Sequence, residues 1–267
     1  MSPLVNVEFG GRLDRLSALI ERFRVHAALA LDAGSDDGVA NFFVYRLSSG
    51  DQRLVFLPNK TTSGVACVCE AIRDGERQEV VARIDISGAG HHLIQALPRC
   101  ISVDLSEAPE LAAVVVPLVA EVVQPRCGGQ AVFHRLSEVV VIRLLRHAIE
   151  KGCTDVGLLA GLAHPRLAGA LVALHNKPGA PWGLETLAAE AGMSRTQFSV
   201  TFKDVLGMTP GAYLANWRLD VARSELEAGT QVKTVARMCG FSSAAAFSRA
   251  FARRYGHAPK QERRKAA

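Results

Sequence analysis

Several familiar features are missing from this 267-residue sequence, and each absence argues against a class of protein. It has no phosphate-cradling glycine loop, no H-E-x-x-H pair and no nucleophile elbow, so it lacks the common enzyme signatures. An apolar run at 111–123 is too short to span a bilayer and contains Pro117 and Glu121. The amino terminus lacks the basic start and apolar core of a secretory signal. We therefore expect a cytoplasmic protein without a membrane partner, and not an enzyme.

Cysteine is also sparse, with six residues and no C-x2-C pair, which gives little support for a zinc site. Cys67 and Cys69 are two residues apart, so on a strand both thiols would lie on one face. Together with His91 and His92 they could bind a metal or sense oxidants. The alternative is that they are inert core residues, because cysteine is among the most buried residue types. The reactive and the inert interpretation of these cysteines both stay open. Our expectation for the chain as a whole is that it binds neither a metal nor another cofactor.

The composition fits a folded chain whose charge is unevenly placed. Hydrophobic residues make up 49% and charged residues 21%, and the length allows two domains with real cores. The net charge is +5. Residues 182–267 hold 13 basic and 7 acidic residues, whereas residues 1–181 hold 18 and 19. The positive excess therefore lies in the carboxyl-terminal third, as phosphate binding requires.

That third contains one pattern twice, F-x3-F-x4-G-x2-P. The second copy lies 49 positions after the first, and the matched residues are Phe198, Phe202, Gly207 and Pro210, then Phe247, Phe251, Gly256 and Pro259. Four matched positions, two of them aromatic, make a specific internal repeat.

Each copy predicts a helix, a tight turn and a second helix. Gly192 and Gly240 follow apolar residues at helical spacing, where a helix end favours positive φ. Ser194, and Ser242 or Ser243, suit the N-cap of the next helix. Such a pair is the helix-turn-helix, whose second helix enters the DNA major groove. An ordinary helical bundle is the alternative, but a bundle does not require the same pattern twice.

The candidate DNA-binding residues lie away from the paired phenylalanines. They are Arg195, Thr196, Gln197, Ser199, Val200 and Lys203 in the first copy, and Ser243, Ala245, Ser248, Arg249 and Arg253 in the second. Arginine can bind a guanine edge with two hydrogen bonds, while alanine, valine and threonine methyls suit the thymine methyl. The residues directly opposite the phenylalanines are poor in long polar side chains; they are Thr196, Ser199, Val200 and Lys203, then Ala245, Ser248, Arg249 and Ala252.

Residues 176–267 resemble the DNA-binding domain of AraC-type transcription regulators. The matching residues are Trp182, the run 187–194, Gly207 with Pro210, and the runs 240–242 and 247–251. The resemblance implies two helix-turn-helix units, 184–205 and 232–254, joined by a long helix at 210–227. It also implies that the recognition helices enter successive segments of the major groove. This chain departs from the family at Val200, where arginine is common, and at Glu262, where an aromatic residue is usual.

The amino-terminal part predicts mostly strands. After an amphipathic helix at 12–24, strands are expected at 25–31, 41–47, 53–57 and 65–72, as in a sandwich or barrel. The run 50–58 looks like an element of the cupin-like sensor domains of AraC-type regulators, and 91–98 looks like the run after the barrel in one subgroup.

From residue 109 the pattern becomes helical. Helices are expected at 110–123, at 129–150 and from Pro165 to His175, followed by a linker at 177–181. The first two have wide apolar faces. The family resemblance suggests that they form a dimer interface, and packing within the chain is the alternative.

These observations predict an α+β chain with a cupin-like β-barrel sensor at 1–105, a helical dimerisation segment at 106–175 and an all-α DNA-binding domain at 176–267. The expected function is sequence-specific transcription regulation controlled by a signal, such as a small-molecule effector. The expected partners are double-stranded promoter DNA, RNA polymerase and a second copy of the chain. Two alternatives stay open: an oxidant-sensing regulator using Cys67 and Cys69, and a cupin-type enzyme with a helical tail. Activation and repression are not distinguished.

Overall fold

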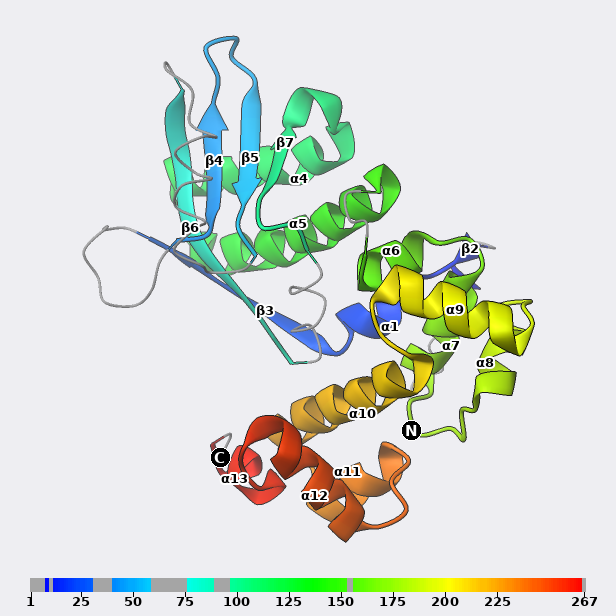
Figure 1. The fold of residues 1–267 in the computed structure, drawn as a ribbon. Coiled ribbons are helices and arrows are strands. Elements are labelled where there is room, and N and C mark those ends of the chain that lie inside the picture. Colours follow the sequence, from blue (N-terminus) through cyan, green and yellow to red (C-terminus); the bar gives the residue numbers. More distant parts are fainter. Residues whose placement is uncertain are drawn as a thin grey trace. The chain divides into compact units, whose positions relative to one another are not determined.

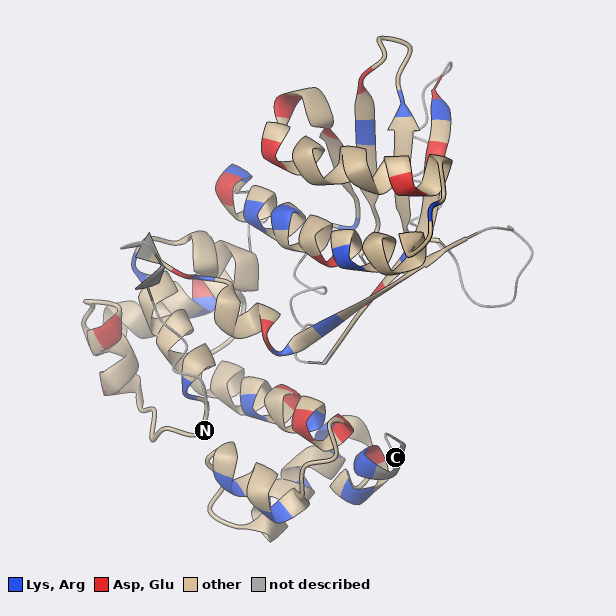
Figure 2. Ribbon diagram, turned by 180° about the vertical axis from the view of Figure 1, so that it is seen from behind, with Lys and Arg blue, Asp and Glu red and all other residues tan. Residues whose placement is uncertain are grey.

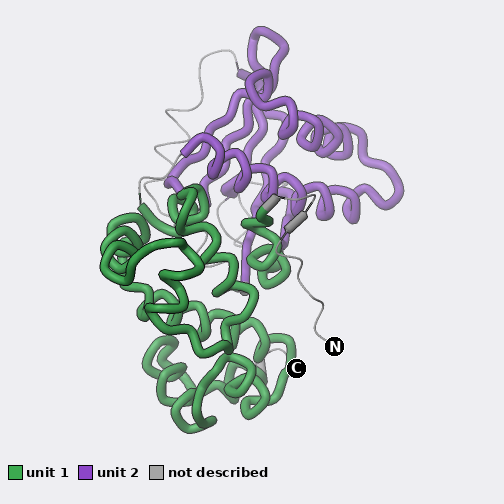
Figure 3. Tube along the Cα trace, turned by 90° about the vertical axis from the view of Figure 1, so that its right-hand side faces the viewer, with its two compact units in different colours: residues 1–24, 88–93, 155–267 green, residues 25–87, 94–154 purple. Residues whose placement is uncertain are grey.

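The computed structural model describes residues 8–9, 12–30, 40–58, 76–88, 97–152 and 156–265 (Figure 1). The chain divides into two compact units (Figure 3). The sheet unit comprises residues 25–87 and 94–154, and the helical unit comprises residues 1–24, 88–93 and 155–267. The expected strand at 65–72, Cys67, Cys69 and the pair His91 and His92 lie outside the described residues.

The sheet unit is built on five strands in the order β3-β6-β4-β5-β7. Their bounds are β3 Phe23–Leu29, β4 Phe42–Arg46, β5 Gln52–Phe56, β6 Arg77–Gly88 and β7 Ile101–Asp104. Strand β4 pairs antiparallel with β5 and with β6, and β5 pairs antiparallel with β7. The turn between β4 and β5 has Gly50 at φ 91°, a conformation that favours glycine. The predicted strands at 41–47 and 53–57 are thereby confirmed.

The two central strands are buried on both faces. Successive strand residues point to opposite faces. Phe43 and Val55 pack in a cluster on one face, while Phe42 and Leu54 are fully buried on the other. Strands covered on both sides need apolar residues throughout, which explains why 41–47 and 53–57 show no strict alternation.

Two long helices lie along one face of this sheet (Figure 1). They are α4 Pro109–Val123 and α5 Gly129–Lys151, preceded by a 3₁₀ turn, Leu105–Glu107. Both were predicted within two residues of their observed bounds. Buried leucines and valines, among them Leu118 and Leu144, join them to each other and to the sheet. In the described part of the chain, no helix is both long enough and apolar enough to span a membrane.

The helical unit contains the other helices of the described ranges. They are α1 Ser17–Ile20, α6 Leu158–Ala163, α7 Leu167–Asn176, α8 Leu184–Glu190, α9 Arg195–Leu206, α10 Pro210–Glu227, α11 Val232–Met238, α12 Ala244–Tyr255 and α13 Pro259–Lys265. A two-stranded ribbon, β1 Glu8–Phe9 and β2 Arg12–Leu13, precedes α1. Helix α1 packs against α7.

The predicted helix at 12–24 is wrong, because a side chain interrupts it. Asp14 accepts hydrogen bonds from the amides of Leu16 and Ser17, at 3.2 and 3.0 Å, which makes a local turn. Only four residues then form α1, and the chain becomes strand β3 at Phe23.

Other bounds differ from the sequence predictions. Strands β6 and β7 and helix α6 were not predicted. The helix expected from Pro165 begins two residues later, at Leu167. Its amino-terminal turn is closed by His164, whose Nδ1 accepts from the amides of Arg166 and Leu167 at 3.2 Å.

Candidate DNA-binding interface

The two predicted helix-turn-helix units are present and their second helices are equivalent. Helices α9 and α12 each have 12 residues and begin 49 positions apart. Each is capped by a serine hydroxyl: Ser194 accepts from the Gln197 amide at 3.3 Å, and Ser243 accepts from the Ala246 amide at 3.1 Å. Each ends at a glycine with positive φ. The repeat therefore places matched residues at matched positions of two helices.

The turn of the second unit requires a glycine for two reasons. Gly240 has φ 74°, and a Cβ there would lie 2.8 Å from the Gly179 carbonyl oxygen. The close approach arises because Arg218 of α10 donates hydrogen bonds to the carbonyls of Pro178 and Ala180, both at 2.8 Å. Partial burial lowers the pKa of Arg218. The predicted linker at 177–181 is thus packed against the turn between α11 and α12.

The paired phenylalanines form the inner face of each unit, as predicted. Phe198 and Phe202 are buried with ring centroids 5.4 Å apart, and Phe247 and Phe251 are buried with centroids 5.6 Å apart. Tyr213 of α10 packs on Phe202 at 5.6 Å. The helical phase is therefore fixed, and the opposite faces of α9 and α12 point away from the core.

The eleven candidate residues all lie outside the cores of the two helix-turn-helix units. The exposed ones are Arg195, Thr196, Gln197, Val200, Lys203, Ser243, Ala245, Arg249 and Arg253, and the half-buried ones are Ser199 and Ser248. Two have hydrogen bonds within their own helices: Ser243 caps α12, and the Ser248 hydroxyl donates to the Ala244 carbonyl at 2.8 Å. These side chains are therefore available to a ligand along two equivalent helices, α9 of the first helix-turn-helix unit and α12 of the second.

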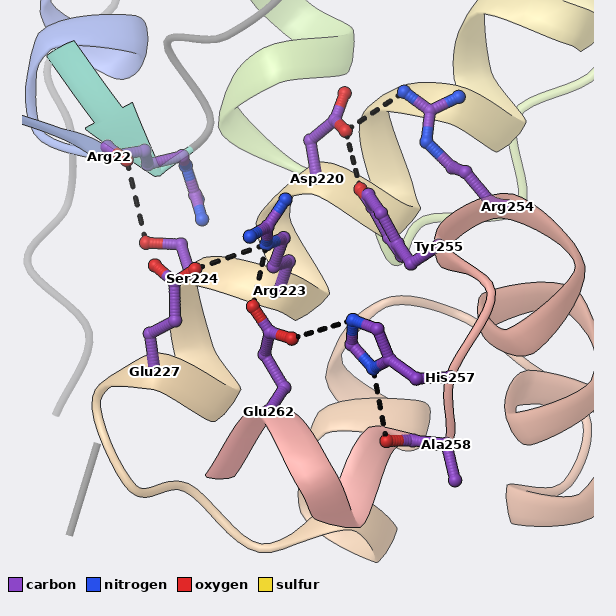
Figure 4. A network of polar contacts seen from close by, with 10 residues as sticks. All are labelled: Arg22, Asp220, Arg223, Ser224, Glu227, Arg254, Tyr255, His257, Ala258 and Glu262. Atoms are coloured by element: carbon purple, nitrogen blue, oxygen red, sulfur yellow. Dashed lines mark hydrogen bonds and ion pairs between the residues drawn. The ribbon is translucent and has the colours of Figure 1, made fainter. Parts of the chain in front are cut away.

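A polar network that the sequence did not reveal attaches α12 to the long helix α10 (Figure 4). Arg254 donates to Asp220 at 3.0 Å and to Asn216 at 2.5 Å, and the Tyr255 hydroxyl donates to Asp220 at 2.7 Å. Burial raises the pKa of Tyr255, so its hydroxyl remains a donor. Arg254 is therefore directed toward α10 and does not join the outward set.

A second part of the network occupies the place of the usual family aromatic. Glu262 of α13 is only 3% exposed. It accepts a hydrogen bond from Arg223 at 2.8 Å and lies 3.0 Å from His257 Nε2 (Figure 4). The matched residue in the first unit, 49 positions earlier, is the buried Tyr213. A paired carboxylate thus replaces an aromatic ring at equivalent positions, because α10 provides the arginine that a buried carboxylate needs.

A buried histidine lies where α7 meets α10. His175 Nε2 is 2.6 Å from the Tyr213 hydroxyl, and its ring centroid is 4.5 Å from that of Trp217. Burial lowers the pKa of His175 to about 3, and the positive charge of Arg22 adds to the effect. Burial likewise raises the pKa of Tyr213. The imidazole is therefore neutral at physiological pH.

We expect the helical unit to lose stability in mild acid because of His175. The unfolded chain binds a proton at this residue below about pH 6.5, whereas the folded chain does not until about pH 3. Stability therefore falls by about 1.4 kcal/mol per pH unit below 6.5, or about 2 kcal/mol at pH 5. Urea unfolding at pH 7 and pH 5 measures this for the wild type and for His175→Gln, which retains an acceptor for Tyr213. An equal pH dependence in both proteins would contradict the assignment.

The sheet unit has a hollow of its own, with a volume of about 570 Å³. Arg46, Gln52 and Glu79 of the sheet line one side, and Val116 and Val123 of α4 line the other. Glu79 accepts from Arg46 and from Gln52, each at 2.6 Å. The lining therefore combines apolar side chains of α4 with an ion pair of the sheet.

One described cysteine, Cys239, is too deeply buried to be a reactive thiol. The described cysteines are Cys100, Cys127 and Cys239, and burial raises the pKa of Cys239 to about 12. A thiol with so high a pKa is almost never the reactive thiolate. Within the described ranges, no three His, Cys, Asp or Glu side chains come together as a metal-binding group.

Comparison with known families matches both units. A helix-turn-helix domain family matches residues 187–265, and a cupin family matches residues 44–150. The chain therefore contains one region similar to cupin domains and another similar to helix-turn-helix domains. The α+β class predicted from the sequence is confirmed.

Similar proteins are named as transcription regulators. The HTH-type transcriptional regulator AlkR of Acinetobacter baylyi is 34% identical over 181 residues, which cover 65% of this chain and 58% of the relative. A putative AraC-like transcription regulator of Streptomyces antibioticus is 33% identical over 172 residues, covering 62% and 56%. The chain thus spans less than two thirds of the length of these relatives.

A solved structure is also similar in part. The DNA-binding domain of the global transcriptional factor AdpA, in complex with a target DNA, is 32% identical. The match covers 38% of this chain and 93% of that one, with a TM-score of 0.37.

Proposed function

We propose that this protein is a sequence-specific DNA-binding transcription regulator. The observation that carries the proposal is the pair of equivalent, serine-capped helices α9 and α12, which direct the eleven candidate residues outward. A helix-turn-helix presents its second helix to the major groove, and flanking cations neutralise phosphates. The similarity to proteins named as regulators supports the same conclusion. We also propose that the protein is not an enzyme and that it is located in the cytoplasm.

The test is the salt dependence of binding by the full chain to a duplex selected from a random-sequence pool. We expect the logarithm of affinity to fall linearly with the logarithm of salt concentration, by about 0.9 per neutralised phosphate. With about six such contacts, affinity falls roughly a thousandfold between 50 and 200 mM salt. Absent or salt-insensitive binding would contradict the proposal.

A matched pair of lysine variants localises the contact. Lys233→Ala removes an exposed cation of α11, and we expect it to reduce the salt slope by about 0.9. Lys151→Ala removes an exposed cation at the end of α5, in the sheet unit, and should leave the slope unchanged. Equal effects of the two variants would show that net charge alone attracts the DNA.

We further propose that the hollow beside α4 receives the small-molecule effector. It has an ion pair between Glu79 and Arg46 on one element and apolar side chains on another. An effector with an apolar body and a polar end fits this lining. The sequence-based domain limits 1–105, 106–175 and 176–267 stay part of this proposal, as does RNA polymerase as a promoter partner.

A second copy of the chain is the partner we propose for α4 and α5. Outside the lining of that hollow, two large apolar side chains of α5 are exposed, Val132 and Val139. A second subunit that covers them would remove this apolar surface from water. This supports the homodimer that the family resemblance implied.

A further inference from the structure

The two recognition helices carry different chemistry at the same positions. This inference rests on the proposed function and concerns which bases each helix contacts. Because α9 and α12 are offset by 49 residues, Val200 corresponds to Arg249, and Thr196 corresponds to Ala245. Both pairs are exposed on the outer face. One equivalent position thus presents an apolar branched side chain in the first unit and a guanidinium in the second.

Val200 is a large apolar side chain on the outer face of α9. It is 55% exposed, because it lies two positions from each of the buried residues Phe198 and Phe202 and therefore on the opposite face of the helix. An exposed β-branched side chain in the middle of a recognition helix can be covered by a thymine methyl in the major groove. The methyl of Thr196, one turn earlier on the same face, suits the same contact.

Arg249 is the group of α12 best placed to hydrogen-bond a base. Among the described residues it has no hydrogen-bond or ion-pair partner, and it lies in the middle of the helix. Arg254 donates to Asp220 of α10 (Figure 4). It also donates to Asn216 of α10, and the Ser248 hydroxyl donates to its own helix. Arg253 lies in the last turn. Recognition helices contact bases mainly through their amino-terminal part, which favours Arg249 over Arg253.

The second helix-turn-helix unit is also the more positively charged of the two. Residues 183–206 contain two basic and three acidic residues, whereas the matched residues 232–255 contain five basic residues and no acidic one. The contrast is visible in Figure 2, where α11 and α12 carry blue segments and α8 carries red ones. Phosphate attraction is therefore concentrated on the second unit, and the first unit depends more on apolar contacts.

We infer that the first unit recognises thymine methyls through Val200 and Thr196, and that the second unit recognises guanine through Arg249. The binding site then has an A·T-dependent segment and a G·C-dependent segment, in the successive major-groove segments that the family resemblance implies for the two recognition helices. Arginine forms two hydrogen bonds with guanine O6 and N7, and valine loses its water-exposed surface against the 5-methyl group of thymine. The base-pair preference of each DNA segment then depends chiefly on one pair of equivalent positions of the repeat, Val200 and Arg249.

Base analogues test this on the duplex that the full chain selects from a random pool. Uracil in place of thymine removes only the methyl group, and 7-deazaguanine in place of guanine removes only the N7 acceptor. Affinities are measured for the wild type, Val200→Ala and Arg249→Ala on duplexes substituted at one position at a time. Circular dichroism checks that both variants, changed at exposed positions, remain folded.

The wild type should bind about fourfold more weakly when uracil replaces a thymine of one segment, the value of one buried methyl group. It should bind about tenfold more weakly when 7-deazaguanine replaces a guanine of the other segment. Val200→Ala, whose shorter side chain withdraws from the base, should reduce the sensitivity to uracil at the thymine that Val200 contacts and keep the sensitivity to 7-deazaguanine. Arg249→Ala should show the reverse.

Failure of either arm overturns the inference. If both variants keep the sensitivities of the wild type, other side chains contact these bases. If Arg249→Ala weakens binding equally on guanine and 7-deazaguanine, that arginine binds phosphate. If the full chain selects no sequence at all and its binding does not weaken in salt, the proposed function itself fails. A selected sequence with steep salt dependence but without the two sensitivities would keep the function and remove only this assignment.

Discussion

Phe251→Ala is expected to destabilise the helical unit by about 3–5 kcal/mol, the usual cost of removing a buried phenylalanine ring. The Phe251 ring is fully buried and lies at the centre of an aromatic cluster. Its centroid is 5.6 Å from that of Phe247, 4.6 Å from that of Tyr255 and 5.8 Å from that of His257. Truncation leaves a cavity between α12 and the residues that follow it. Phe198→Ala should have an effect of similar size in the first unit.

Tryptophan fluorescence during urea unfolding measures this change selectively. Both tryptophans of the sequence, Trp182 and Trp217, lie in the helical unit, so the signal reports on that unit alone. Val200→Ala is the matched control, because it shortens an exposed side chain and should change stability by no more than about 0.5 kcal/mol. An unchanged unfolding midpoint for Phe251→Ala would show that the outer faces of α9 and α12 have been assigned wrongly.

Asp220→Ala is expected to cost about 3 kcal/mol, although it removes a side chain far from the outer face. Asp220 is buried and accepts from both Arg254 and Tyr255. Without the carboxylate, a largely buried guanidinium loses its counter-charge, and breaking such a pair typically costs about 3–5 kcal/mol. The lower end applies because the Arg254 side chain is 21% exposed. Helix α12 should then be attached less firmly to α10, and the affinity of the protein for DNA should fall as well.

Two further variants separate charge from contact. Asp220→Asn keeps an oxygen that can accept from the Tyr255 hydroxyl, so it should be milder than the alanine change. Arg254→Met in the Asp220→Ala background removes the unpaired cation and should restore part of the lost stability. If the double variant is as unstable as the sum of the single ones, the two residues are not coupled and the network does not hold α12.

Residues close together in the sequence allowed the helix-turn-helix units to be predicted in detail. Caps, turn glycines and phenylalanines four residues apart act within one or two turns of helix, so their spacing specifies their geometry. The family resemblance implied helix α10 with its observed bounds, Pro210 to Glu227. The outward position of the candidate residues followed from the same periodicity. Their contact with DNA stays a prediction.

The sheet unit was predicted less well, because the long strand β6 contains several charged residues. Strand β6 includes Arg77, Glu79, Arg83 and Asp85 among its apolar residues, and that composition does not resemble a strand when taken alone. Its charges are accommodated by partners elsewhere, as Glu79 is by Arg46 and Gln52. The helix wrongly predicted at 12–24 has apolar residues at helical spacing, but the Asp14 side chain favours a turn.

The sequence by itself determined the local elements of this protein: the twofold repeat, the helix caps, the inner faces of α9 and α12 and the concentration of positive charge near the carboxyl end. The tertiary structure alone decided which charged residues remain available. Arg249 and Arg254 are five residues apart on one helix and indistinguishable by type, yet only Arg254 meets Asp220 of α10. The same holds for Glu262, which Arg223 and His257 stabilise in the interior. Pairing between charges depends on distances between helices, and the spacing of residues within one helix does not contain that information.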